Sequence, residues 1–284
     1  MNLLPLVKKF TPFAVKRFLA NLLRNGFVKK ERLFQEMFAH VENGEVKITV
    51  PELNGHFWID IRSHLLRRVL INREYEPQVS RLIENSLSQD FIDVGANVGF
   101  YSIHVSKHPS FQGKVVAVEP NPRAYEFLTK NITENNVSDN VISLNYAASS
   151  IEEKLVLSAV EGMEEYSTLT GNMHPGTREK STVEYEVYAK TIDSIVSEHT
   201  LSPGLIKIDA EGAELSVLQG AKNTLAQFRP TIICEIGAST FGSDTRGISK
   251  VFKECNYSLF SIDGAPVSIE SGEVSEIVAR PNNV

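Results

Sequence analysis

The sequence contains little cysteine and no long apolar run, and both absences narrow its class. Cys234 and Cys255 are the two cysteines among 284 residues, and neither has the spacing of a disulfide framework or a zinc site. No apolar stretch approaches the ~20 residues that a membrane-spanning helix needs. Lys and Arg interrupt the apolar residues near the start of the chain, so a secretory signal is not expected. We therefore expect a reducing, cytoplasmic environment.

An excess of positive charge is also missing. The formal net charge is −6, whereas a nucleic-acid partner requires a basic face, so we expect no nucleic-acid partner. Hydrophobic residues make up 42% and charged residues 23% of the chain, which is typical of a globular protein. This length suits one large domain with appendages.

The first 30 residues differ from the rest because they carry seven Lys or Arg and no acid. Apolar residues recur at helical spacing over residues 12–24, which predicts a basic amphipathic helix. Such a helix either lies on the inner face of an anionic membrane or packs on the domain or on a second subunit of a homo-oligomer. Both arrangements stay open.

Two further segments precede the central part of the chain. Residues 46–50 and 56–61 flank Asn54-Gly55, which predicts a hairpin with a two-residue turn. Glu76 comes just before a helix start at Pro77, where it either reaches a ligand or caps the helix. We expect an N-terminal extension over residues 1–72 and a main domain over residues 73–284, with an insertion at 150–190.

The stretch FIDVGANVGF (residues 91–100) organises the main domain. An apolar strand leads into a turn containing Gly95, Asn97 and Gly99, and a helical pattern follows. This strand, turn and helix start is the usual opening of a nucleotide-type binding site. Asp93 places a carboxylate beside the ligand, which disfavours the pyrophosphate of a dinucleotide and favours a cationic ligand such as S-adenosylmethionine.

The next strand, residues 114–118, ends in Glu119, about twenty residues after the turn. An acid at this position normally holds ribose hydroxyls, whether the ligand is NAD or S-adenosylmethionine. An NAD-dependent oxidoreductase on the same fold therefore stays an alternative, as does a non-catalytic module that binds S-adenosylmethionine.

Strands and helices continue to alternate along the chain, which predicts a mostly parallel, doubly wound sheet. Strand ends place Asp93, Glu119, Asp209 and Glu235 at one edge of that sheet. Ligands bind at this edge in open α/β sheets. Residues 150–190 break the alternation. A loop as long as that at 161–181 is usually either disordered or a lid, and we expect a role in substrate recognition.

Four stretches of the chain stand out: FIDVGANVGFYS (91–102), VAVEPNP (116–122), IKIDAEGAELSVLQGA (206–221) and RPTIICE (229–235). Together they resemble the FkbM family of S-adenosylmethionine-dependent methyltransferases. The resemblance covers residues 73–262. It implies a class I methyltransferase fold, a Rossmann-like seven-stranded sheet, and O-methylation of a hydroxyl on a sugar, glycan or related natural product. The resemblance does not identify the acceptor, which we expect to be a small molecule or a glycan.

The expected site follows from these motifs. The residues expected to contact S-adenosylmethionine are Glu76, Asp93, Gly95, Ala96, Asn97, Gly99, Tyr101, Glu119, Pro120, Asn121, Ala147, Ala148 and Asp209. The small side chains of Ala147 and Ala148 would allow an adenine ring to lie close.

The expected catalytic residues are Asp209 as general base, Lys207 tuning it, and Glu211 and Glu235 beside it. Alternatively, Lys207 and Asp209 form a structural ion pair, or Asp209 and Glu235 bind Mg²⁺. We expect no metal at the site.

Overall fold

The computed structural model describes residues 44–71, 75–87, 89–160, 162–169, 181–236, 243–271 and 274–282, together with residues 38 and 41. The helix expected over residues 12–24 lies outside these ranges, as does most of the loop at 161–181. In the described part of the chain, no helix is both long enough and apolar enough to cross a membrane.

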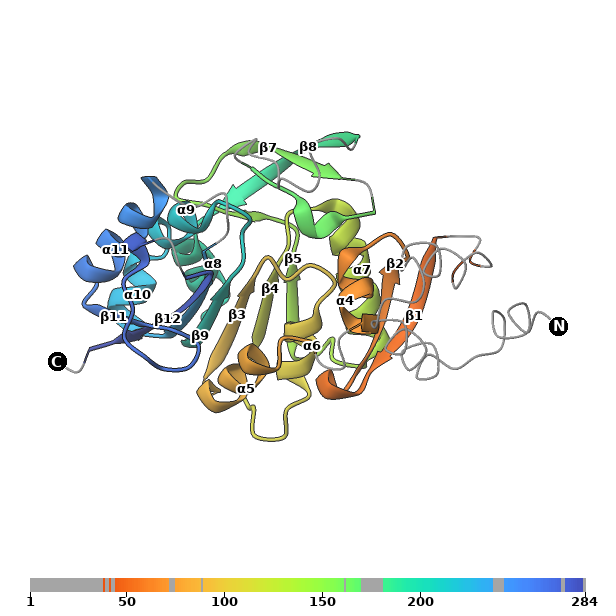
Figure 1. Ribbon diagram of the computed structural model, residues 1–284, viewed down its shortest axis with the longest axis horizontal. Coiled ribbons are helices and arrows are strands. Elements are labelled where there is room, and N and C mark those ends of the chain that lie inside the picture. Colours follow the sequence, from red (N-terminus) through yellow and green to blue (C-terminus); the bar gives the residue numbers. More distant parts are fainter. Residues whose placement is uncertain are drawn as a thin grey trace.

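The centre of the protein is a seven-stranded sheet (Figure 1). In spatial order its strands are β11 (Tyr257–Phe260), β12 (Glu276–Pro281), β10 (Thr231–Glu235), β9 (Pro203–Ile208), β3 (Asp90–Val94), β4 (Val115–Val118) and β5 (Val141–Leu144). β12 runs antiparallel to both its neighbours, and the other strands pair in parallel. The predicted α/β fold with a doubly wound, Rossmann-like sheet is confirmed.

The order of the strands reverses between β3 and β9. The chain moves outward from β3 through β4 to β5, then returns to the other side of β3 and continues outward through β9 and β10. Ligands of open α/β sheets bind at such a reversal, outside the carboxyl ends of the strands. This reversal places the candidate site beyond the ends of β3 and β9.

Helices cover both faces of the sheet, and each face has its own apolar core. The first face is covered by α4 (His64–Ile71), α5 (Pro77–Ser86), α6 (Phe100–Ser106) and α7 (Pro122–Glu134). The second is covered by α8 (Ile192–Glu198), α9 (Glu214–Gln219), α10 (Lys222–Phe228) and α11 (Ser243–Glu254). Alternate residues of one strand supply the two cores, since Phe91 packs in the first and Ile92 in the second.

The predicted hairpin is present, but its turn differs from the expected one. β1 (Glu45–Val50) pairs antiparallel with β2 (Gly55–Asp60), and Val50 faces Gly55. The connection is the 3-10 turn η2 (Pro51–Leu53) followed by Asn54 at φ 50°, so the expected two-residue turn at Asn54-Gly55 was wrong. Pro51 favours the helical φ of this turn, and the buried Leu53 fixes it to the core.

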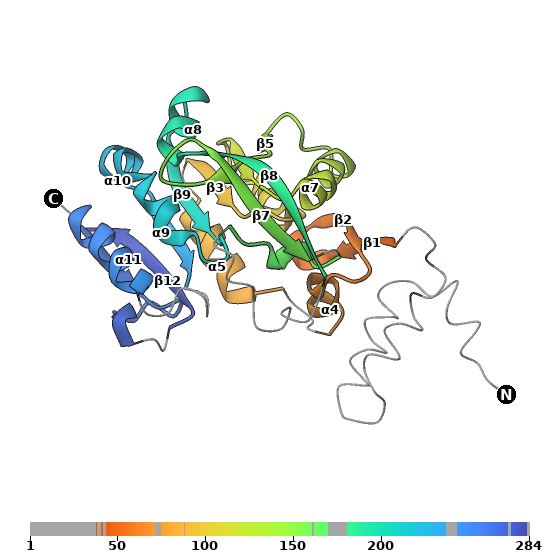
Figure 2. The same ribbon diagram turned by 90° about the horizontal axis from the view of Figure 1, so that it is seen from above.

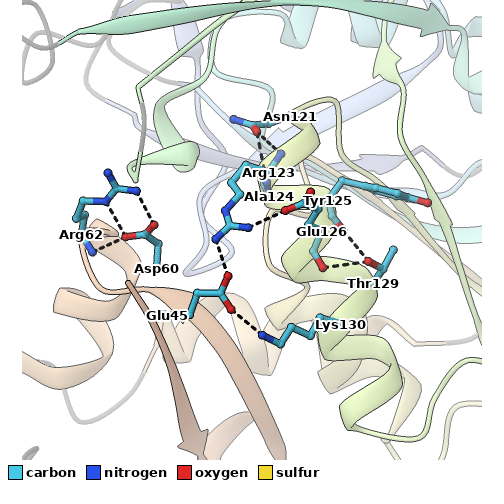
Figure 3. Close-up of polar contacts among 10 residues, drawn as sticks. All are labelled: Glu45, Asp60, Arg62, Asn121, Arg123, Ala124, Tyr125, Glu126, Thr129 and Lys130. Atoms are coloured by element: carbon cyan, nitrogen blue, oxygen red, sulfur yellow. Dashed lines mark hydrogen bonds and ion pairs between the residues drawn. The ribbon is translucent and has the colours of Figure 1, made fainter. Parts of the chain in front are cut away.

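The hairpin packs on α7 through charged side chains, which Figure 3 shows, and through the buried amide of Asn131. Glu45 accepts from Arg123 at 2.6 Å and from Lys130 at 2.7 Å. The ammonium of Lys130 also lies 3.8 Å from the centre of the Trp58 ring. Asn131, which is fully buried, pairs with the backbone of Trp58 in both directions. The hairpin and the main sheet therefore share one core, and the boundary expected at residue 72 stays a prediction.

Two strands of the expected insertion and a short strand just before it form a separate three-stranded sheet. β8 (Thr182–Lys190) pairs antiparallel with β7 (Lys154–Val160) and in parallel with the short β6 (Ala147–Ala148). Figures 1 and 2 show β7 and β8 lying across one end of the seven-stranded sheet. The insertion thus covers an end of the main sheet.

Candidate functional site

The turn after β3 has the backbone geometry that its sequence predicts. Gly95 and Gly99 have φ values of 76° and 89°, and Asn97 has φ 50°. The amides of Gly95 and Ala96 donate to Val118 O at 2.9 and 3.1 Å, which ties the turn to β4. A Cβ on Gly95 would lie 1.8 Å from the carbonyl oxygen of Asp209, so this position requires glycine. The turn after β3 and the loop after β9 are therefore in direct backbone contact.

The buried side-chain amide of Asn131 bonds to the backbone of the glycine turn. Asn131 of α7 donates from Nδ2 to Val98 O at 2.9 Å, in addition to its bonds with Trp58. The sequence analysis did not find this residue, because one Asn within a helix carries no signal of a partner far away in the sequence. Asn131 connects the turn, α7 and the hairpin.

Glu119 lies at the end of β4 and faces the same turn. Its carboxylate accepts from the amides of Asn97 and Asn121, both at 2.8 Å, and the residue is only 5% exposed. Burial raises its pKa to about 7, although the two amide bonds oppose that rise. A carboxylate has about four acceptor positions, so this one can still accept hydroxyl groups such as those of a ribose.

Asn121, predicted to contact the donor, has a clear structural role. Its Oδ1 accepts from the amides of Arg123 and Ala124 and so caps α7 (Figure 3). Its Nδ2 donates to Ser167 Oγ at 2.7 Å. Asn121 therefore links the end of β4 to the insertion.

Asp93 and Lys207 are register partners on β3 and β9, and their side chains share one face of the sheet. Ser102 Oγ donates to Asp93 Oδ2 at 2.6 Å, while Asp93 Oδ1 is buried with no partner among the described atoms. Burial raises the pKa of Asp93, and the ammonium of Lys207 opposes the rise. Asp93 is only 1% exposed and lies beneath α6, farther from solvent than the sequence suggested.

Lys207 and Asp209 form an ion pair at the end of β9, with Nζ 2.9 Å from Oδ2. Burial favours the neutral form of Asp209, but the charge of Lys207 and a hydrogen bond with Glu235 hold the pKa of Asp209 below its ordinary value. The adjacent charge of Asp209 raises the pKa of Glu235. These opposite directions favour the state in which Glu235 carries the proton and Asp209 the charge.

Glu76 contacts the site and does not cap α5. Its φ is 40°, and its side chain makes no capping bond. The carboxylate instead accepts from Arg68 of α4 and from the hydroxyl of Tyr101. Tyr101 lies with its ring centre 5.2 Å from the ammonium of Lys207. Glu76, Tyr101 and Lys207 are therefore connected, and the donor-binding role of Glu76 stays a prediction.

Two more carboxyl groups, those of Glu211 and Glu276, lie at the edge of the sheet where β9 and β10 end. Glu211 has φ 44°, and burial followed by the charge of Asp209 raises its pKa to about 8. Glu276 of β12 stands directly opposite Glu235 in the antiparallel register, and burial raises its pKa to about 7. The sequence analysis missed Glu276, because the acid precedes an apolar run rather than ending one. Only the antiparallel direction of β12 brings it to this edge.

Residues 165–168 of the insertion reach the same edge. Glu165 accepts from Ser63 Oγ and from the backbone amide of His64 at the start of α4. Ser167 contacts Asn121, as described above, and Thr168 donates from Oγ1 to the carbonyl oxygen of Glu211 at 3.2 Å. The segment thus extends from the end of β4 to the loop after β9.

Ala147 and Ala148 do not form an exposed surface beside the turn after β3. They form β6 and are 1% and 5% exposed. Ala147 packs with Leu157 and Val187 of the insertion, and Ala148 joins the second core. Their contact with an adenine ring stays a prediction.

A cluster of three or more His, Cys, Asp or Glu side chains arranged to hold a metal ion is not found within the described ranges. The Mg²⁺ interpretation of Asp209 and Glu235 stays an untested alternative. The described edge has more carboxyl groups than cationic groups, and several of them have raised pKa values. A positively charged ligand would favour their ionised forms.

Comparison with known proteins agrees with the motifs. A family profile for the methyltransferase FkbM domain matches residues 93–259. The chain is 33% identical over 188 residues to the hexuronic acid methyltransferase AglP of Haloferax volcanii, covering 64% of this chain and 70% of that protein.

Two further proteins are less similar. The chain is 30% identical over 164 residues to the methyltransferase sdnD of Sordaria araneosa, covering 49% of this chain and 62% of that protein. A crystal structure of methyltransferase FkbM from Methylobacillus flagellatus aligns with a TM-score of 0.45 and 17% identity, over 68% of this chain and 43% of that one. The chain thus spans less than two thirds of both proteins.

Proposed function

The chain belongs to the FkbM methyltransferase family, and on that premise we propose that it is an O-methyltransferase. It transfers a methyl group from S-adenosylmethionine to a hydroxyl group of a sugar, glycan or related natural product. The observation that carries this proposal is the acidic edge at the reversal between β3 and β9. There Glu119 accepts from the Asn97 amide of the glycine turn, and Asp209, which bonds to Glu235, packs its backbone against Gly95.

The proposed binding site for the methyl donor consists of the glycine turn and Glu119. Gly95 and Gly99 allow the positive φ values of this turn, and the Asn97 amide within it donates to Glu119. The remaining acceptor positions of the Glu119 carboxylate suit the two ribose hydroxyls. Bound S-adenosylmethionine supplies a methyl group already activated by the sulfonium charge. The protein therefore mainly has to orient the two reactants, an effect worth several kcal/mol.

Asp209 is our candidate for the group that orients the acceptor hydroxyl and takes up its proton. Its low pKa is compatible with this role, because the hydroxyl oxygen becomes strongly acidic as the new C–O bond forms. Lys207 keeps Asp209 ionised, and the proton of Glu235 fixes one of its oxygens. The remaining lone pairs of Asp209 can then accept from the acceptor hydroxyl.

The sugar acceptor is suggested by the relative at 33% identity, which is a hexuronic acid methyltransferase. A hexuronic acid offers both hydroxyl groups and a carboxylate as methyl acceptors. We place the transfer on a hydroxyl, because a carboxylate is already ionised and would not need the Asp209–Glu235 pair.

The test is to incubate the purified protein with methyl-labelled S-adenosylmethionine and a panel of hexoses, hexuronic acids and oligosaccharides. We expect label in the acceptor that survives mild alkali, because a methyl ether is stable there and a methyl ester is not. Release of the label by alkali would show carboxylate methylation and contradict the hydroxyl assignment. Binding of NAD, without binding of S-adenosylhomocysteine, would contradict the donor assignment.

A further inference from the structure

The side chain of Glu214 holds two backbone amides of the loop after β9. Glu214 is the first residue of α9 and is only 1% exposed. Its Oε1 accepts from the amides of Ala210 and Gly212, at 3.3 and 3.0 Å. Burial of a carboxylate costs free energy unless hydrogen bonds compensate it, so the position of this side chain and the shape of the loop depend on each other.

The loop that Glu214 holds has an unfavourable backbone conformation. Glu211 and Gly212 follow each other at φ values of 44° and 97°, a region that is costly for any residue other than glycine. Thr168 of the insertion donates to the carbonyl oxygen of Glu211 at 3.2 Å. Side chains of α9 and of the insertion therefore stabilise a conformation that the loop alone would not favour.

One peptide group connects this loop to the glycine turn. The carbonyl oxygen of Asp209 lies so close to Gly95 that a Cβ there would approach it to 1.8 Å. The N–H of the same peptide group belongs to Ala210 and donates to Glu214. The amide of Asp209 itself donates to Val94 O at 3.0 Å. The backbone on both sides of the Asp209 side chain is thus bonded, to β3 before it and to Glu214 after it.

We propose that Glu214 is a positioning residue of the methyl-transfer site. By fixing the peptide group between Asp209 and Ala210, it sets the direction of the Asp209 carboxylate and keeps the carbonyl oxygen of Asp209 against Gly95. The inference rests on the proposed function and adds a residue that acts on both reactants through the backbone. Rotation of this peptide group would displace the carboxylate and the glycine turn together, and a displacement of about 1 Å can cost about 10²-fold in rate.

The experiment compares Glu214→Ala with Glu214→Gln in the full chain. Alanine removes the acceptor of both amides, whereas the side-chain oxygen of glutamine can still accept from them. In Glu214→Ala we expect the Kd of S-adenosylhomocysteine, measured by titration calorimetry, to rise about tenfold, because the glycine turn loses its preorganised form. We expect kcat, measured with the sugar of the panel that takes up label, to fall about 10²-fold. In Glu214→Gln both quantities should stay within about threefold of the wild-type values.

Asp193→Ala is the matched control for a loss of stability. The Asp193 carboxylate also accepts from two backbone amides, those of Asn223 and Thr224 at the start of α10. We expect the Tm of this variant to fall as that of Glu214→Ala does, since each substitution leaves two amides without their acceptor. Measured well below both Tm values, the Kd and kcat of Asp193→Ala should equal those of the wild type, because Asp193 holds a contact between two helices, α8 and α10.

Three results would overturn the inference: wild-type Kd and kcat in Glu214→Ala, equal losses in Glu214→Gln, or equal losses in Asp193→Ala. The calorimetric comparison decides among them even if no sugar of the panel takes up label. Failure of S-adenosylhomocysteine to bind to the wild type would instead contradict the proposed function.

A further variant covers the case in which Glu214→Ala shows no cooperative unfolding transition. Glu214→Asp then replaces it, because its carboxylate is one methylene too short to bond both amides. We expect its Kd for S-adenosylhomocysteine to exceed that of Glu214→Gln about fivefold. Equal Kd values in these two variants would overturn the inference.

Discussion

The side chains of Asp209 and Glu235 share a hydrogen bond at the ends of two neighbouring parallel strands. One proton serves both carboxyl groups, because two adjacent carboxylates cannot both stay ionised at low cost. Lys207 decides where the proton resides: its ion pair favours the charged form of Asp209. The pair therefore presents one fixed anion beside the glycine turn, together with one neutral donor.

Replacing Asp209 tests the assignment of the base. In Asp209→Asn we expect kcat to fall about 10²- to 10⁴-fold, the usual contribution of a positioned base. The Kd of S-adenosylhomocysteine should stay within about twofold. Labelled methyl transfer and calorimetry on the same preparation provide the two measurements. A variant that methylates at the wild-type rate would remove Asp209 from the mechanism.

The dependence of kcat on pH separates Asp209 from Glu211. With Asp209 as base, kcat should stay level between about pH 6 and 9, because its lowered pKa keeps it ionised throughout. With Glu211 as base, kcat should fall about tenfold per unit below pH 8, since its pKa is about 8. Stopped assays with saturating substrates will show which profile holds. In Glu211→Gln we expect both kcat and its level pH profile to remain. A large fall in kcat would favour Glu211 as the base.

Gly95 and Gly264 form a matched pair for testing the contact between the glycine turn and the loop after β9. Both have positive φ, 76° and 84°, but a Cβ on Gly95 would overlap the carbonyl oxygen of Asp209, whereas one on Gly264 would meet nothing within 4 Å. Gly264→Ala should cost only the backbone penalty of about 1 kcal/mol. Gly95→Ala should cost about 3 kcal/mol or more, with weakened donor binding. Equal changes in Tm would argue against the overlap.

Asn131 should affect both stability and donor binding. Asn131→Leu leaves the carbonyl of Val98 and the backbone of Trp58 without their partner, and each buried unsatisfied group costs about 1–3 kcal/mol. We expect a large fall in Tm and a weaker Kd for S-adenosylhomocysteine measured well below that Tm. Asn140→Leu, at an exposed position, is the control. An unchanged Kd would show that Asn131 contributes to stability and not to donor binding.

The ligand-free protein should lose stability as the pH rises towards 7. The folded state keeps a proton on Glu276 up to a pKa of about 7, whereas the ordinary value is 4.5. Between these values the folded state binds more protons than the unfolded state, so the free energy of unfolding decreases as pH increases. Glu119 acts in the same direction.

Glu276→Gln removes one of these ionisations. Its Tm should therefore fall less between pH 5 and 7 than that of the wild type, as differential scanning calorimetry will show. Glu184→Gln, at an exposed position on β8, should keep the wild-type slope. A steeper slope in Glu276→Gln would contradict the raised pKa.

The sequence predicted those parts of the fold that local patterns determine. Apolar strands followed by acids indicated β3, β4, β9 and β10, and the glycine turn indicated the start of α6. These signals are local, because the strand, the turn and the helix start are contiguous in the chain. Local turn preference failed at Asn54-Gly55, where Pro51 and the buried Leu53 set a longer connection.

Partners from distant segments could not be predicted. Glu276, Asn131 and Tyr166 acquire their positions from strand pairing, helix packing and the course of the insertion. In the sequence each is an ordinary residue of its type, and only the assembled sheet and helices reveal its neighbours. Ala147 and Ala148 show the same limit, since pairing with β8 buries them in the second sheet.

The packing of the hairpin on α7 has a consequence for fragments of this protein. The stretch that matches the family profile begins at residue 93, yet Phe57 and Ile59 of β2 pack in the same core as Phe127 and Leu128 of α7. A polypeptide cut to the matched stretch would expose that apolar surface and leave Asn131 without Trp58. We expect such a fragment to aggregate on expression and the autonomous folding unit to extend at least back to Glu45.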